Sequence, residues 1–318
     1  MLRFVMTDVS GTEHLTGAPI TLNIRMDEGV PADDLYAVFA YTDVGELRAI
    51  RAYDDDRLLF TGVVDEQEHL FSENGRFLRI SARSLAAHLL DNEAMPRVYD
   101  HPSASLIYER HVMPYGIAWA DSDDATYFGE QMITKGMSEW TALKNFCTSC
   151  YSTTPRIGAD GVLRMKGASS DNRIVFSDSG DGVAYLELRE SKKRCEEISR
   201  VNIKVADTEG YRFMMDNTDA IERGIRRERY LNAVLTSTPM TCADAMIASG
   251  KAASYSLTLT CAGDLLHCMG NSAEVVSRQL GTLGDLYVSG LSYHLSARGD
   301  TTTVQLKRRN SICGYQDM

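Results

Sequence analysis

The 318-residue sequence lacks any apolar run close to the roughly 18 residues that a membrane-spanning helix needs. Its opening segment, MLRFVMTDVSGTEH, carries one basic residue and only a short apolar run before Asp8. That run is too short for the apolar core of a secretory signal. We therefore expect a protein that is made and kept in the cytoplasm, and we expect no membrane partner.

Cysteine is absent from the first 146 residues, and the seven that follow are an odd number spread over half of the chain: Cys147, Cys150, Cys195, Cys242, Cys261, Cys268 and Cys313. A disulfide framework would be denser and even, so mostly reduced, buried thiols are expected. Cys147 and Cys150 form a CxxC pair at the C-terminal end of an expected helix, whereas a redox pair needs the N-terminus. A zinc site would need a second pair at motif spacing. We expect no metal, and keep a metal or redox pair as the alternative.

Positive charge is in short supply, with 33 basic against 44 acidic residues and a net charge of −11. Nucleic acid and anionic membranes would be repelled by this balance, so specific nucleic-acid binding is not expected. One dense basic cluster stands out, formed by Arg223, Arg226, Arg227 and Arg229. It is either a solvated loop or strand edge, or a docking patch in which arginines pair with an acidic neighbour.

Catalytic signatures are missing as well. The sequence has no GxSxG, GxGxxG or GxxxxGK motif and no HExxH, so neither a nucleophile elbow nor a phosphate cradle is indicated. Acidic neighbours such as Asp65 and Glu66 would point to opposite faces of a strand and could not flank one sugar. We therefore expect no enzymatic activity, no catalytic residues and no bound cofactor.

What is present indicates an α+β, β-dominated protein of three units: a first β domain at residues 1–94, a mixed helix and hairpin insert at 95–194, and a second β domain at 195–318. In the first unit, short strand-like segments separated by turn signals predict a sandwich or a barrel. In the first unit they lie at 2–6, 20–26, 35–41, 46–52, 58–70 and 76–82, followed by a short helix at 84–90. The Asn74-Gly75 pair favours a type I′ turn between the last two strands.

In the insert, Ser138 is expected to cap a helix that carries Trp140, Leu143, Phe146 and Cys147 at helical spacing. Residues 177–182, SDSGDG, are the best linker candidate. The third unit is predicted to contain strands at 200–205, 211–215, 254–260, 286–295 and 301–306. The segment 272–280 fits a helix or a strand.

Three segments, TGVVDEQE, LLDNEAMPRVYDHPS and HVMPYG, all within Leu59 to Gly116, resemble the baseplate hub family of contractile phage tails, in the branch of PBSX-like prophages and phage-tail-like bacteriocins. The resemblance implies two small β-barrels per chain and a homotrimeric ring between the six-fold tail tube and the three-fold central spike. It favours a strand at 272–280 and a structural role for His111, and it supplies no residue-level site.

The resemblance also implies partners and a place of action. The expected partners are further copies of this chain, the tail tube protein, the central spike protein, other baseplate proteins and a tape measure protein. The protein would act in the baseplate of a virion or phage-tail-like particle assembled in the bacterial cytoplasm. Two alternatives remain: a tail-associated cell-wall hydrolase, which needs paired carboxylates or a metal, and a receptor- or carbohydrate-binding tail protein, which exposed aromatic clusters would favour.

Overall fold

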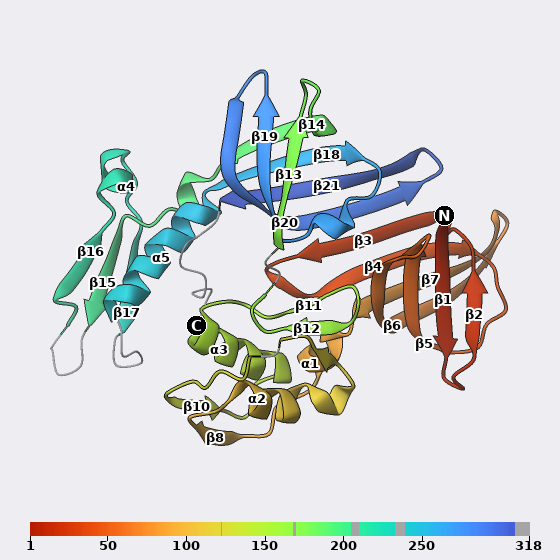
Figure 1. Cartoon of the computed structure of the whole chain (residues 1–318), viewed down its shortest axis with the longest axis horizontal. Helices are drawn as coiled ribbons and strands as arrows, with labels where there is room; N and C mark the ends of the chain where they lie inside the picture. Colours follow the sequence, from red (N-terminus) through yellow and green to blue (C-terminus); the bar gives the residue numbers. More distant parts are fainter. Residues whose placement is uncertain (122, 168–169, 205–209, 233–238, 309–318) are drawn as a thin grey trace.

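The structure is a computed structural model that describes residues 1–121, 123–167, 170–204, 210–232 and 239–308. Figure 1 shows an N-terminal sheet, a barrel, a mixed unit below both, and a small sheet with the helices α4 and α5 at the side. In the part of the chain that the structure describes, no helix is long and apolar enough to cross a membrane. Cys313 lies outside the described residues.

The N-terminal sheet has seven antiparallel strands in the order β3-β4-β7-β6-β5-β1-β2. Alternating residues of these strands are buried, and they place Phe4, Ile24 and Ile80 in the core with no exposed surface. The strands are β1 (Leu2–Asp8), β2 (Glu13–Thr16), β3 (Thr21–Asp27), β4 (Val30–Ala40), β5 (Leu47–Asp54), β6 (Arg57–Ser72) and β7 (Gly75–Ser84).

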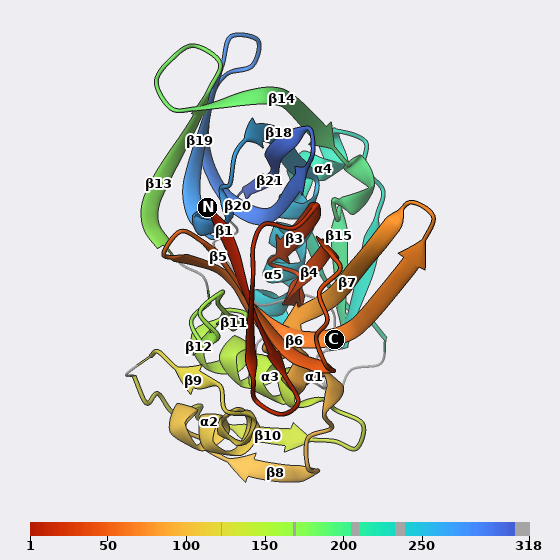
Figure 2. The same cartoon turned by 90° about the vertical axis from the view of Figure 1, so that its right-hand side faces the viewer.

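The second β unit is a closed barrel of six strands in the order β19-β13-β14-β18-β21-β20, with β20 pairing back to β19. Figure 2 shows these strands surrounding the barrel interior. The segment 272–280 is mostly a strand, as the resemblance favours. The barrel strands are β13 (Ser170–Ser177), β14 (Val183–Lys192), β18 (Tyr255–Ala262), β19 (Asn271–Ser277), β20 (Gly281–Ser296) and β21 (Gly299–Arg308).

The two β units are one continuous sheet, because β20 also pairs with β3 along Gly290 to Leu295. A single hydrophobic core runs through both. The β-dominated α+β class is confirmed, and the C-terminal barrel is closed. The N-terminal strands form a curved open sheet instead, since the edge of β3 that could close it is occupied by β20.

Strand pairing also shows which segments of the chain form the barrel. β13 and β14 cover residues 170–192, which the sequence analysis placed in the insert, and they pair with β19 and β18 of the barrel. The SDSGDG segment is a corner between these two barrel strands and not a linker between domains. The three-domain division stays a prediction, and we propose that the barrel unit begins at residue 170.

The mixed unit packs two short sheets, β10-β8 and β11-β12-β9, with the helices α2 and α3, and its core is separate from that of the barrel. Ser138 caps α3 as predicted, accepting a hydrogen bond from the backbone N–H of Thr141 at 3.2 Å, and Trp140, Leu143 and Phe146 are buried. The elements are α1 (Ala86–Asp91), β8 (Arg97–Asp100), α2 (Ala104–His111), η1 (Met113–Tyr115), β9 (Ala118–Trp119), β10 (Glu130–Ile133), α3 (Glu139–Tyr151), β11 (Arg156–Ile157) and β12 (Val162–Arg164).

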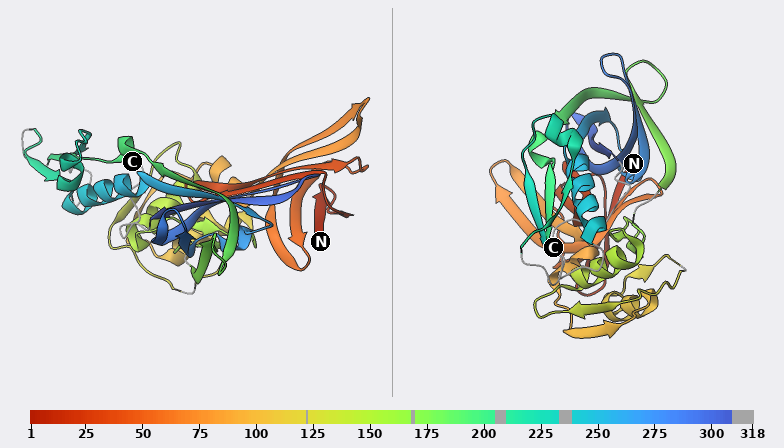
Figure 3. Two further views of the ribbon diagram at one scale, coloured as in Figure 1. Left: turned by 90° about the horizontal axis from the view of Figure 1, so that it is seen from above. Right: turned by 90° about the vertical axis from the view of Figure 1, so that its left-hand side faces the viewer.

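The small side unit is a three-stranded sheet in the order β16-β15-β17, covered on one face by α5. Seen from above, it extends away from the rest of the molecule, opposite the β6–β7 hairpin (Figure 3). Its elements are η2 (Arg194–Glu196), β15 (Arg200–Lys204), β16 (Phe213–Asp216), α4 (Thr218–Glu222), β17 (Glu228–Asn232) and α5 (Pro239–Ala253), and η4 (Leu266–Cys268) follows in the barrel.

One turn differs from its prediction. The β6–β7 hairpin is closed by the pair Ser72 and Gly75, so its loop is Glu73-Asn74 and Gly75 belongs to β7. A type I′ turn at Asn74-Gly75 would need positive φ at both residues, and only Gly75 has it, at 130°. Glycine tolerates that φ because it has no Cβ, and the predicted turn type is therefore wrong while the predicted hairpin is correct.

Candidate functional site

The arginine cluster predicted from the sequence gathers around the start of β17, but its members are not equivalent. Arg223 donates from Nη1 to Glu197 Oε1 at 2.9 Å, from Nη2 to the other Glu197 oxygen, and to Asp219 Oδ2 at 3.1 Å. Glu197 is buried, and the Arg223 guanidinium holds the pKa of its carboxyl below the usual value. Arg223 therefore fixes α4 to the chain before β15, and its charge is satisfied internally.

The other three arginines are less fully paired. Arg227 lies 3.5 Å from Glu196 Oε2 and also donates to the Cys195 carbonyl. Arg226 and Arg229 donate only to backbone carbonyls, at 3.1 to 3.3 Å. Among the described residues no carboxylate lies within ion-pair distance of Arg226 or Arg229. The predicted docking patch is thus reduced to these two side chains and stays a prediction.

The face of the β15–β17 sheet opposite α5 carries exposed apolar side chains that sequence reasoning missed. In its central row, Met214 and Tyr230 flank Asn202, and they are 55% and 64% exposed. Tyr211 stands against Tyr230 with ring centroids 5.0 Å apart. Lys204 follows Asn202 by two residues and lies on the same face, because strand side chains alternate.

A second unpartnered face lies on the two-stranded sheet of β8 and β10. On the inward face of the sheet, Tyr99, Gln131 and Ile133 are buried. On the outward face, Val98 is paired with Met132, and both are more than half exposed. The next outward pair is Asp100 opposite Glu130, two like charges directly across the ladder. Such a pair is unfavourable by a few tenths of a kcal/mol to about 1 kcal/mol unless a cation compensates it.

A buried polar network braces the mixed unit around His111, whose side chain is 3% exposed. His111 Nδ1 lies 2.5 Å from Glu139 Oε2, its Nε2 lies 3.0 Å from Tyr99 Oη, and Tyr115 donates to Glu139 Oε1 at 3.3 Å. Burial, and then Glu139, raise the pKa of Tyr115. The network ties α2, β8 and α3 together, and this placement supports the structural role expected for His111.

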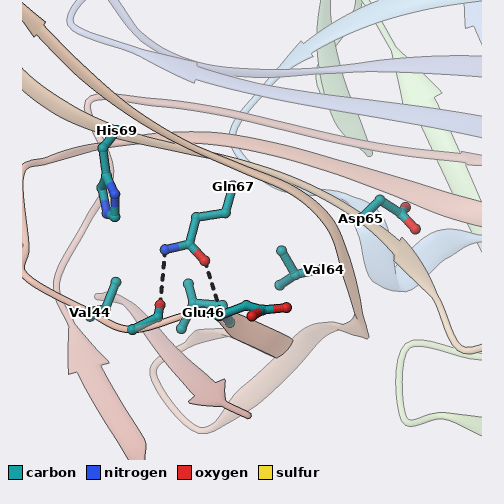
Figure 4. Close-up of a pocket in the computed structure, with 8 residues that line it drawn as sticks. Val44, Glu46, Val64, Asp65, Gln67 and His69 are labelled. Carbon is teal, nitrogen blue, oxygen red and sulfur yellow. Dashed lines mark hydrogen bonds between the residues drawn. The ribbon is translucent and has the colours of Figure 1, made fainter.

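A groove of about 460 Å³ lies between the β4–β5 connection and β6. Gln67 bridges its walls, accepting from the Leu47 N–H at 2.8 Å and donating to the Gly45 carbonyl at 3.0 Å (Figure 4). Glu46 and Asp65 both line the groove, yet both Asp65 oxygens accept hydrogen bonds from Arg83, at 2.8 and 2.9 Å. Asp65 is thereby held as an ion-pair partner and is unsuited to act as a general acid.

The CxxC pair lies at the C-terminal end of α3, as predicted. Cys147 is fully buried and Cys150 partly buried, and burial raises the pKa of both thiols. A raised pKa disfavours the thiolate that metal binding and redox exchange require. Across the described residues, no group of three or more His, Cys, Asp or Glu side chains could hold a metal ion.

No protein-family model and no curated protein matches the sequence. Solved structures do match. A tail protein from Neisseria meningitidis shares the fold at a TM-score of 0.78 and 18% identity over 98% of each chain. The 43 kDa tail protein of prophage MuSo2 from Shewanella oneidensis gives 0.75 and 14%, covering 98% of this chain and 99% of its own.

A third structure is an Escherichia coli component of the type VI secretion system, described as similar to the T4 bacteriophage tail proteins gp27 and gp5. It matches at a TM-score of 0.53 and 11% identity, covering 94% of this chain and 76% of its own. The likeness to phage tail proteins that the sequence indicates is therefore confirmed at the level of the fold.

Proposed function

We propose that this chain is a structural baseplate hub of a contractile tail. The observation that carries the proposal is the match in fold to two tail proteins over 98% of this chain and nearly all of theirs. The protein would act in a virion or phage-tail-like particle, whose PBSX-like or bacteriocin character the resemblance suggests.

The finer part of the proposal is a symmetry adaptor. Three copies would close into a ring, and since each copy contributes two β units, the ring would present six units to a six-fold tail tube while remaining three-fold toward a central spike. The continuous sheet through β3 and β20 supports this, because it fixes the two units relative to one another. Tube, spike, neighbouring baseplate proteins and the tape measure protein would be the partners.

We propose that the role is not catalytic. A cell-wall hydrolase needs two free carboxylates across a cleft or a metal, and in the groove of the N-terminal sheet Asp65 is already engaged by Arg83. The test is zymography of the purified protein on peptidoglycan. A lytic band that persists after contaminating lysins are removed would overturn the non-catalytic role.

The oligomer is tested by sedimentation equilibrium of the purified chain and by electron microscopy of the intact particle. We expect a species of three times 35.3 kDa, and a three-fold ring stacked on the tube. Six copies of this chain in the ring would refute the symmetry-adaptor proposal, because six pairs of β units would exceed a six-fold tube.

A further inference from the structure

Two exposed sheet faces of the described chain have matching patterns. On the β8–β10 sheet, an apolar pair, Val98 and Met132, lies beside the acidic pair Asp100 and Glu130. On the β15–β17 sheet, the apolar Met214 and Tyr230 share a row, and Lys204 lies one row further on the same face. In both faces an apolar row and a charged row are two residues apart along a strand, which is about 7 Å.

The charged row that holds Asp100 and Glu130 and the row that holds Lys204 are opposite in sign. On the other side of its apolar row, the β15–β17 face carries both signs, with Arg200 between Asp216 and Glu228. The ring of His101 contacts Asp100, with Nδ1 2.6 Å from Asp100 Oδ1, while Glu130 has no ion-pair partner among the described residues. Lys204 likewise has no ion pair with any described carboxylate. A cation placed against Asp100 and Glu130 would relieve the like-charge pair that the register creates.

The side chains of both apolar rows are also exposed to solvent. Val98 and Met132 are 54% and 60% exposed, and Met214 and Tyr230 are 55% and 64% exposed. Both faces belong to small sheets whose opposite sides are packed on their own units, so covering them would not disturb either core. A tyrosine and a methionine beside a charged row have the composition of an interface centre and its rim.

We propose that the β8–β10 face of one copy binds the β15–β17 face of a second copy of this chain. The contact is heterologous, since the two faces differ, and a heterologous contact generates a ring when its rotation closes. This inference rests on the proposed homotrimer and identifies the surfaces that join neighbouring copies. Glu130 of one copy pairs with Lys204 of the next, and Val98 and Met132 pack against Met214 and Tyr230.

The test uses the full-length chain with Cys195 and Cys313 replaced by serine, because Cys195 is exposed and Cys313 lies outside the described residues. A new surface thiol can then be addressed selectively. Chains carrying Val98→Cys are mixed with chains carrying Tyr230→Cys and treated with a short bis-maleimide. We expect a two-chain product from the mixture, none from either variant alone, and a three-chain product from the chain that carries both. Leu186→Cys, 71% exposed on β14, replaces Tyr230→Cys in the control and should give no product.

A charge exchange tests the polar row. Glu130→Lys and Lys204→Glu should each weaken self-association at least tenfold in sedimentation equilibrium, and the double variant should recover most of the loss. Circular dichroism and thermal unfolding verify that each variant is folded. A double variant no better than the worse single variant would overturn the pairing.

The outcomes separate the two proposals. A trimer that forms without the Val98–Tyr230 cross-link would overturn this interface and leave the hub proposal standing. A chain that stays monomeric at high concentration would overturn both.

Discussion

The buried ion pair between Asp33 and Arg156 gives a pH dependence that can be worked out from the structure. Asp33 of β4 is 2% exposed, and Arg156 Nη2 donates to both of its oxygens at 2.9 Å. The pair joins the mixed unit to the N-terminal sheet. Burial raises the pKa of Asp33 to about 6, although Arg156 acts in the opposite direction. One guanidinium nitrogen thus compensates only part of the desolvation of the carboxylate.

The sign follows from comparing the folded and unfolded states. The pKa of Asp33 is about 6 when folded against 3.8 ordinarily, so the folded state binds more protons between these values. The contribution of Asp33 to stability is therefore full below about pH 3.8 and is lost as pH rises through about 6. At about 1.36 kcal/mol for each pH unit, the loss is roughly 3 kcal/mol. Asp33→Asn removes this loss. The free energy of unfolding of the variant should therefore increase relative to that of the wild type as pH rises from 4 to 7.

The assay is urea unfolding followed by tryptophan fluorescence. The chain has two tryptophans, Trp119 and Trp140, and both lie in the mixed unit that the ion pair anchors. Arg156→Met, which leaves the carboxylate unpaired, should cost about 3 to 5 kcal/mol at pH 7 and much less at pH 4.

The matched control is the exposed pair of Asp160 and Arg164 in the neighbouring hairpin, where Arg164 lowers the pKa of Asp160. Asp160→Asn should act with the opposite sign, losing stability relative to the wild type as pH rises, by less than about 1 kcal/mol because the pair is solvated. A stability difference between Asp33→Asn and wild type that stays flat from pH 4 to 7, or that favours the wild type at the higher pH, would refute the reasoning.

Three further outcomes are expected. Replacing Cys147 and Cys150 with alanine should cost about 1 to 2 kcal/mol through lost burial and leave particle assembly intact, and stoichiometric zinc in the wild type by elemental analysis would contradict this. Gly62→Ala should destabilise the fold by more than about 2 kcal/mol, because a Cβ would lie 2.2 Å from the Arg83 carbonyl, whereas Gly17→Ala, with open space around it, should be nearly neutral in the same urea titration. The channel of the proposed ring should be predominantly acidic so that DNA or a protein tape passes without binding, and a ring map with a basic channel would refute this.

Local sequence signals predicted local structure well. Ser138 at a cap position and Trp140, Leu143 and Phe146 at helical spacing were enough to place α3, because a helix depends on neighbours within four residues. The predicted strands at 286–295 and 301–306 lie within β20 and β21, and Gly299 at the turn between them has a φ of 111°, which glycine accepts. These elements require no knowledge of distant partners.

The docking faces could not be predicted in this way, because they depend on register. Asp100 and Glu130 are thirty positions apart in sequence, and nothing local shows that they are opposite each other in a ladder. The same holds for Asp33 and Arg156, which are 123 residues apart. The arginine cluster could be recognised in the sequence because its residues are close together along the chain. Its pairing could not, because Glu197, whose carboxylate accepts from Arg223, is brought to it only by the fold.

The pairing of β13 and β14 with the barrel strands β19 and β18 likewise depends on segments that are far apart in the sequence. Strand β20 explains how the two β units are joined. The first part of β20 pairs with β19 to close the barrel, and from Gly290 onward it pairs with β3 of the open sheet. At the changeover the ladder between β20 and β21 shifts register between Val288 and Gly290, which is a bulge. A bulge bends a strand and increases its twist, so one strand can leave the barrel wall and continue into a flatter sheet.

Ser289 lies within this bulge, where its hydroxyl donates to the Gln305 carbonyl and its own carbonyl accepts from the Glu28 N–H at 2.9 Å. The angle between the two β units is therefore set by backbone hydrogen bonds across the bulge and not by a flexible connection. In a ring, the spacing of the six β units would follow from two quantities: this internal angle and the geometry of the contact between copies. Only the second of these can be altered by surface substitutions, which is why the cross-linking and charge-exchange experiments address assembly without perturbing the fold.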